Sequence, residues 1–415
     1  MCNPGGFTIP GPKRTHMLPN ILWIVTTQWR GQALGCAGDV NARTPALDAL
    51  AREGAMFTQA VTPHPFGPFA RAAMLTGVES PANGVRDYFD VLPPDARTIA
   101  HDMADRSYST SFFGKWHLSE RDREAPLTGD AHARRVVPKA NQGGFAFWEG
   151  FESGFLINNP WLHGTRLADP LQFEGYQSDV VCERAGAFLS GVAGPWFSVV
   201  SLEAPHPPYA APAAGIVPAD PSMVALRMNV PEPGPVAEKA RLELSGYYAH
   251  IEATDRAIGR LLSGLPADTV VVFTSVHGDM HGSHGLFRKG WPHEESVRVP
   301  LIVRGMGRPG PDSRPVSLID LPAMTTACAD GKATVALRSE STSGYARISM
   351  PSVVALPGQC DRVWTGLRSI KRKFVSGPGG AHWLHFDLEN DPLEMRNLDA
   401  GTRNPFSSRP ASSPS

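Results

Sequence analysis

The chain has 415 residues, of which 42% are hydrophobic, enough for one large buried core with a smaller appended unit. Its 39 basic side chains balance 40 acidic ones, which argues against binding to nucleic acid or to an anionic membrane. Residues 1–16 lack the apolar segment of a secretory signal, and no apolar run is long enough for a membrane span. Five scattered cysteines, an odd number, are typical of reduced thiols in a cytoplasmic protein. We expect Cys36, Cys182 and Cys328 to be buried.

Short apolar runs alternate with helical patterns along most of the chain. Residues 21–26 are typical of a strand that is buried on both faces. At Thr44 and Pro45 a capping hydroxyl precedes a proline, which predicts the start of a helix. Residues 238–262 have helical periodicity, interrupted by the polar Thr254. Further strand-like runs are 109–113, 196–202, 269–275 and 300–303. This alternation predicts an α/β fold with a large, mainly parallel central sheet flanked by helices.

The pattern changes near the C-terminus. From about residue 338 the segments are short and β-rich, such as 363–367 and 383–386, which predicts a small sheet. Residues 401–415 are rich in Ser, Pro and Arg and have the composition of a disordered tail. We therefore divide the chain into a flexible N-terminal segment (1–17), an α/β domain (18–335), a β-rich subdomain (336–400) and a disordered tail (401–415).

Polar side chains follow several of the predicted strands directly. Thr27, Lys115 and His206 each come at or just after the end of a strand-like run, and so does Val276 with its neighbour His277. The carboxyl ends of parallel strands meet at one edge of a sheet, where α/β proteins place their ligand sites. We expect these residues to lie close together.

Ordered blocks of the chain resemble the type I sulfatases, a family with an alkaline phosphatase-like fold. The matching blocks are residues 19–30, 44–50, 64–77, Gly114-Lys115-Trp116-His117-Leu118, Pro205-His206-Pro207-Pro208-Tyr209, 273–279 with 284–286 and 289–290, and 386–392. Together they extend over roughly residues 19–398, so the resemblance is much more specific than one short motif. It implies the sulfatase fold, whose small C-terminal sheet is antiparallel.

The family's signature loop has lost its nucleophile here. The family motif reads Cys/Ser-x-Pro-x-Arg-Ala and closes on Leu-Thr-Gly, and its first residue becomes the formylglycine that attacks sulfate esters. This chain keeps Arg71 and the closing residues 75–77, but Gly67 takes the first position and Phe69 the proline position. Glycine has no side chain to oxidise or hydrate, so Gly67 marks a vestigial nucleophile position. We expect no formylglycine-dependent arylsulfatase activity.

The resemblance also implies a calcium or magnesium site, and its ligands are changed as well. Thr27 and Val276 stand where the family has carboxylates, and only Gln28 and His277 match its pattern. Hard divalent cations need several oxygen ligands, usually more than one carboxylate. We therefore expect no bound calcium or magnesium, and a metal-independent protein.

The basic residues of the family's sulfate pocket are retained. Arg71, Lys115, His117, His206 and Lys289 occupy positions that line this pocket or protonate the leaving group. Without the carboxylates and the cation, we expect these groups to lack nearby anionic partners, which favours a sulfate, phosphate or carboxylate ligand. The alternative is that the lysines are solvated at the surface and the histidines bind backbone groups.

Two functions are compatible with these residues. In the first, a repurposed enzyme acts on an anionic small molecule, with His117, His206 and His277 as acid and base. The substrate-binding residues would then be Arg71, Lys115, Lys289, Gln28 and Thr27. Elimination, cyclisation, acyl or phosphoryl-type transfer and hydrolysis all remain open as reaction types. In the second, the protein is a catalytically inactive pseudosulfatase that acts as a binding or regulatory partner.

Some residues are left with open roles. His277, His281 and His284 lie close together in sequence and offer an alternative zinc or iron site. His64 either reaches the emptied nucleophile site or belongs to a surface turn. Glu203 is a candidate buried carboxylate near His206. Asp279 either orients an imidazole or caps a turn.

Overall fold

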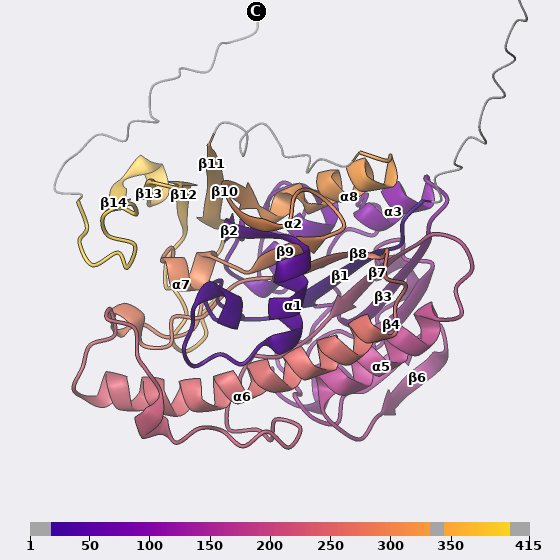
Figure 1. Ribbon diagram of the computed structural model, residues 1–415, viewed down its shortest axis with the longest axis horizontal. Coiled ribbons are helices and arrows are strands. Elements are labelled where there is room, and N and C mark those ends of the chain that lie inside the picture. The colour runs from indigo at the N-terminus through magenta and orange to yellow at the C-terminus, as the bar shows by residue number, and fades with distance from the viewer. Residues whose placement is uncertain (1–17, 333–343, 399–415) are drawn as a thin grey trace, which may run out of the picture.

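The computed structural model describes residues 18–332 and 344–398. The expected flexible segment 1–17 and the expected tail 401–415 lie outside these residues. Within them, the chain forms a ten-stranded sheet, a four-stranded sheet and helices on both faces of the larger sheet (Figure 1). This confirms the fold class expected from the sequence.

The larger sheet has the strand order β10-β2-β9-β8-β1-β7-β3-β4-β5-β6. Its strands are β1 (Ile21–Thr26), β2 (Ala55–Val61), β3 (Ser109–Lys115), β4 (Phe147–Phe151), β5 (Trp161–Gly164), β6 (Leu167–Gln172), β7 (Trp196–Ser201), β8 (Val270–Ser275), β9 (Leu301–Arg304) and β10 (Gly310–Ser317). In the centre, β8, β1, β7 and β3 are parallel neighbours, so their carboxyl ends share one edge. Antiparallel pairing involves β9 on one side and β5 and β6 on the other.

Helices cover both faces of this sheet. Figure 1 shows α1 (Pro45–Glu53), α5 (Gln177–Leu189) and α6 (Pro235–Ser263) on one face. The other face carries α2 (Gly67–Thr76), α3 (Ile99–Ala104) and α8 (Leu321–Ala329). Two short helices, α4 (Asp130–Ala133) and α7 (Glu294–Val297), lie in connections. Within the described ranges, every helix is too short or too polar to cross a bilayer.

The start of α1 was predicted correctly, but its cap was not. Thr44 precedes the helix as expected, yet its hydroxyl donates to the Asp48 carboxylate at 2.9 Å and does not cap the backbone. The first amides of α1, those of Ala46 and Leu47, instead donate to Asp255 of α6 at 3.0 and 2.9 Å. A carboxylate at a helix N-terminus accepts orphan amides and complements the helix dipole.

The apolar stripe of α6 continues through its polar interruption. Thr254 is fully buried, and its hydroxyl lies 3.3 Å from the Tyr176 hydroxyl and 3.1 Å from that of Ser178. A buried polar group is tolerated when it is hydrogen-bonded, so Thr254 does not disturb the packing of α6 against α5.

The second sheet is antiparallel, with the order β11-β12-β13-β14, and its expected orientation is confirmed. Its strands are β11 (Tyr345–Met350), β12 (Trp364–Ser369), β13 (Arg372–Ser376) and β14 (His382–Asp387). Cys182 and Cys328 are buried as expected. The expectation for Cys36 was wrong, because the turn before α1 exposes it.

Candidate functional site

The carboxyl edge of the central strands collects most of the residues singled out by sequence. Thr27 and Gln28 follow β1, Lys115 ends β3, His206 follows β7 and His277 follows β8. All are buried, and so are His117, Arg71 and Lys289. The expected alternative of solvated surface lysines is therefore wrong for Lys115 and Lys289, which are 0% and 7% exposed.

Arg71 of α2 joins three of the strands. Its guanidinium donates to the Ser201 hydroxyl at 2.7 Å, to the Lys115 carbonyl at 3.1 Å and to the Thr27 hydroxyl at 3.0 Å. Among the described residues its Nε has no partner. Burial lowers the pKa of Arg71 to about 10, so the guanidinium keeps its charge at neutral pH. Arg71 thus places a fixed positive charge in the site.

Lys115 is paired with a carboxylate. Its Nζ donates to Glu203 Oε1 at 2.7 Å, and both side chains are inaccessible to solvent. The same carboxylate oxygen lies 3.6 Å from His206 Nδ1. Burial lowers the pKa of Lys115 to about 8, against the opposing effect of Glu203. The expectation that the basic groups lack anionic partners was therefore wrong for Lys115, and Glu203 is the buried carboxylate near His206.

Lys289 is held through an amide. Its Nζ donates to Gln28 Oε1 at 2.7 Å and lies 3.3 Å from His206 Nε2. The Gln28 amide in turn donates to Asp279 Oδ2 at 2.5 Å, and the Tyr209 hydroxyl donates to the same oxygen at 2.8 Å. Burial lowers the pKa of Lys289 to about 7. Lys289 has no direct carboxylate contact within 4 Å among the described residues, so it is less compensated than Lys115.

The three histidines of the site differ in their partners. His206 Nδ1 lies 2.8 Å from the Pro207 carbonyl, and His277 Nδ1 lies 2.8 Å from the Gly278 carbonyl. These bonds place the proton on Nδ1, which leaves Nε2 of each ring as an acceptor. In the described part of the chain, neither ring nitrogen of His117 has a partner. Burial, with neighbouring cations, holds the pKa of all three well below its usual range, so the rings are neutral near pH 7.

An aromatic wall adjoins these groups. The ring of Phe155 stacks on His206 with centroids 4.4 Å apart, and Lys115 Nζ lies 4.6 Å from the Phe155 centroid. Tyr88 meets His117 edge-on at 5.6 Å. Sequence reasoning missed Phe155 and Tyr88, because both lie in connections without a recognisable motif.

Two residues with open roles are structural. His64 is buried, its Nδ1 lies 3.2 Å from the Ser349 carbonyl, and its Nε2 accepts the Ser80 amide at 2.9 Å. Nδ1 of His64 thus joins the loop before α2 to β11, and Nε2 fixes this loop to the connection that follows α2. Asp279 caps a turn, because Oδ1 accepts the backbone amides of His281 and Arg288 at 3.0 Å each.

Comparison with known proteins decides the family. A family model described as Sulfatase matches residues 19–331, most of the chain. The chain belongs to the sulfatase family. The ulvan-active sulfatase of Formosa agariphila is 36% identical over 320 residues, which cover 74% of this chain and 59% of that protein. The choline-sulfatase of Rhizobium meliloti is 27% identical over 443 residues, covering 93% of this chain and 83% of the relative.

The solved structures give the same fold. The yidJ protein of Bacteroides fragilis superimposes with a TM-score of 0.79 at 23% identity, covering 95% of this chain and 93% of that one. The sulfatase resemblance expected from the sequence is confirmed.

In this chain, the residues at the sulfatase family's cation-binding positions do not suit a divalent cation. The Thr27 hydroxyl donates to the Leu202 carbonyl at 3.0 Å and accepts from Arg71, while Gln28 Oε1 accepts from Lys289. Val276 is buried in the apolar core and offers no ligand. Two protein cations thus bind the oxygens that a metal would need, and they would repel it.

The sulfatase nucleophile position is the first residue of α2. A Cβ added to Gly67 would lie 3.0 Å from His117 Nδ1 and 3.3 Å from His117 Cε1. In the described residues no other atom beyond the chain neighbours and the helix's own backbone comes within 4 Å of that point. The imidazole of His117 therefore faces the place from which the family's nucleophile would project.

The three histidines of the alternative zinc or iron site do not form one cluster. His281 is buried against the rings of Tyr209 and Tyr247, with centroids 5.0 and 4.4 Å away. His284 lies instead near Glu295 and Glu394, and these are the one group of three candidate ligands within 4.8 Å in residues 18–332 and 344–398.

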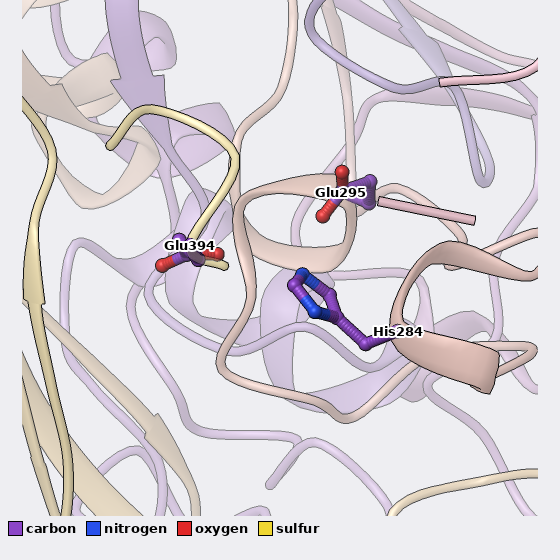
Figure 2. Close-up of side chains that lie close together, drawn as sticks. All are labelled: His284, Glu295 and Glu394. Carbon is purple, nitrogen blue, oxygen red and sulfur yellow. The ribbon is translucent and has the colours of Figure 1, made fainter. Parts of the chain in front are cut away.

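Figure 2 shows His284, Glu295 and Glu394 converging from three segments. Both carboxylates already have cationic partners. Glu394 Oε1 accepts from Lys373 at 2.6 Å, and Glu295 Oε1 accepts from Arg227 at 3.0 Å. Because the negative charge is already balanced, we assign this cluster to the attachment of the C-terminal segment.

Proposed function

We propose that this sulfatase-family protein is a metal-independent enzyme that acts on an anionic small molecule. Arg71, Lys115 and Lys289 bind the anion, with Gln28 and Thr27 orienting Lys289 and Arg71. His117, His206 and His277 supply acid and base groups. The observation that carries the proposal is the burial of three cationic side chains beside three neutral imidazoles at one sheet edge.

The charge balance supports an anionic ligand. Below pH 7, Arg71, Lys115 and Lys289 contribute three positive charges, and Glu203 is the one carboxylate that contacts any of them directly among the described residues. Buried charges are costly unless they are paired, so an anion with two charges would complete the balance. The named relatives include an ulvan-active sulfatase and a choline-sulfatase, whose substrates carry sulfate groups.

The imidazoles suit proton transfer at neutral pH. His206 Nε2 lies 3.3 Å from Lys289 Nζ, so a proton can pass between an ammonium and a neutral ring. His277 Nε2 is buried and has no partner among the described residues, so its lone pair is free to accept a proton from substrate or water.

A binding or regulatory role is the second candidate. One observation favours it: Lys115 is paired with Glu203 and Lys289 with Gln28 without any ligand. A site whose lysines already have hydrogen-bond partners binds an anion less strongly than an open one, and it needs no turnover to be stable.

Turnover and binding assays separate the two candidates. Turnover would be measured across anionic metabolites with a chelator present, for the wild type, His117→Ala and His206→Ala. The enzyme predicts turnover that resists the chelator and falls in both variants. Absence of turnover for every compound, with sulfate or phosphate still bound, would favour the binding role.

A further inference from the structure

Among the three histidines of the site, His117, His206 and His277, His117 has the least complete hydrogen bonding. It is 4% exposed, and neither ring nitrogen has a partner among the described residues. In His206 and His277, by contrast, Nδ1 is hydrogen-bonded to a backbone carbonyl. Buried polar groups in folded proteins are nearly always paired, so an imidazole with two free nitrogens marks a place for water or a ligand.

The ring of His117 is held in place without hydrogen bonds. Tyr88 and Phe155 meet it edge-on at 5.6 and 6.1 Å. Its Nδ1 lies 3.0 Å from the position that a Cβ of residue 67 would take. With Gly67 lacking any side chain, His117 is the side chain that comes nearest to the vacated nucleophile position.

The electrostatics of the site suit a neutral nucleophile attacking an anion. Burial and the charges of Arg121, Lys115, Arg71 and Lys289 hold the pKa of His117 well below its usual range. A ring nitrogen therefore keeps its lone pair at neutral pH, as a nucleophile requires. The same lysines and Arg71 neutralise an incoming anion and the charge that develops on it.

We propose that His117 is the nucleophile of this site and accepts a phosphoryl group from a phosphate monoester with an aromatic leaving group. The inference rests on the proposed function and names its substrate class. With Lys289 protonated, the excess of two positive charges matches the dianion of a phosphate monoester, where a sulfate monoester carries only one charge. Phe155, which is partly exposed beside His117 and His206, provides apolar surface for the aromatic group.

The reaction has two steps. A lone pair on one His117 nitrogen attacks phosphorus, so an N–P bond forms and the ester P–O bond breaks. The leaving oxygen takes the electron pair of that bond, and the proton that the other ring nitrogen gives up passes through solvent to this oxygen. Water then attacks phosphorus, the N–P bond breaks, and its electron pair returns to the ring. One proton of the water returns to the ring, and the other leaves with inorganic phosphate.

The test uses 4-nitrophenyl phosphate as the probe, with the full-length protein in chelator. We expect a burst of nitrophenolate of up to one equivalent per chain. Quenching in alkali preserves an N–P bond, so peptide mass spectrometry should find one phosphoryl group on His117, and this label should disappear in acid. Turnover in His117→Asn should fall by about 100-fold or more, without a label.

Three controls make the result specific. His277→Asn changes another imidazole of the site and should keep the label on His117. His250→Asn changes a buried histidine of α6 that contacts the Tyr176 hydroxyl, and it should leave turnover unchanged. His117→Gly should regain turnover with free imidazole but remain unlabelled. Thermal unfolding of each variant checks that it is folded.

The failures of the two proposals can be distinguished. Turnover by the wild type without a label on His117, but lost in His117→Asn, would overturn the nucleophile and leave His117 as an acid or base of the proposed enzyme. Faster turnover of 4-nitrophenyl sulfate than of the phosphate would overturn the substrate class. Absence of both turnover and label would overturn this inference, and the metabolite screen would then decide the proposed function separately.

Discussion

Lys115 and Glu203 form a solvent-inaccessible ion pair, with Nζ 2.7 Å from Oε1, at the ends of neighbouring parallel strands. Glu203 Oε2 has no partner among the described residues. The pair therefore does two things. It stabilises a lysine that burial would otherwise neutralise, and it offsets part of the positive charge available to an anion.

Glu203→Gln should separate these two effects. Removing one partner of a buried ion pair costs about 3–5 kcal/mol, so we expect the free energy of unfolding to fall by that amount at pH 6. Sulfate affinity should rise by about tenfold, because the site loses its negative charge. Urea unfolding and calorimetric titration measure the two quantities.

Glu149→Gln is the matched control for Glu203→Gln. Glu149 is also buried and pairs with Arg166 and Arg184, but outside the site. Its replacement should lower the free energy of unfolding without changing sulfate affinity. A weaker affinity for sulfate in Glu203→Gln would show that Glu203 supports the anion and does not compete with it.

Sulfate binding should depend on pH through the two lysines. The pKa of Lys289 is about 7 and that of Lys115 about 8, and a bound anion raises both because it favours the ammonium form. At pH values above these pKa values, sulfate binding is therefore coupled to protonation of the two lysines. Affinity should be constant below pH 7 and fall by about tenfold per pH unit above it, and more steeply above pH 8.

Sulfate is a suitable probe for this titration because its own charge is constant over that range. Lys289→Met should weaken binding at every pH and remove the decline that begins near pH 7. An affinity that stays level to pH 9 in the wild type would contradict the assignment of these lysines to the anion.

Gly67→Cys tests whether a thiol at position 67 is enough to give the protein sulfatase chemistry. The new Cβ would lie 3.0 Å from His117 Nδ1, so the ring must move by a few tenths of an ångström, at a cost of about 1–3 kcal/mol. We expect a folded protein that releases no nitrophenol from 4-nitrophenyl sulfate, with or without calcium. Calcium-dependent release would show that the cation site is still functional.

Lys373→Met tests the attachment of the C-terminal sheet. Lys373 is fully buried and binds Glu294 at 2.8 Å and Glu394 at 2.6 Å. Its loss leaves two buried carboxylates without this partner and should cost about 3–5 kcal/mol. Lys371→Met, which removes an exposed pair with Glu389, should cost less than about 1 kcal/mol. Equal effects in urea unfolding would contradict the assigned role.

The fold was largely predictable from sequence, because its signals are local. The apolar run of β1 and the periodicity of α6 each reflect burial along one element. The cap of α1 was not predictable, since Asp255 reaches it from another helix. Strand ends also shifted by a residue or two, as for β3, which extends to Lys115.

The candidate site was predictable in its members but not in its pairings. Motif positions correctly placed Arg71, Lys115 and Lys289 together. Whether a cation has an anionic partner depends on residues from other strands, and nothing near Lys115 in the sequence indicates Glu203. The neutral state of His117 likewise follows from burial and from four cations, of which Arg71 and Lys289 come from other segments.

Calorimetric titration of sulfate into the purified protein, with chelator and then with added calcium, tests directly whether the site binds an anion without a divalent cation. We expect one sulfate per chain with the same affinity in both conditions, and a weaker affinity in Lys289→Met. Binding that appears only when calcium is present, or stoichiometric calcium retained through purification, would contradict it.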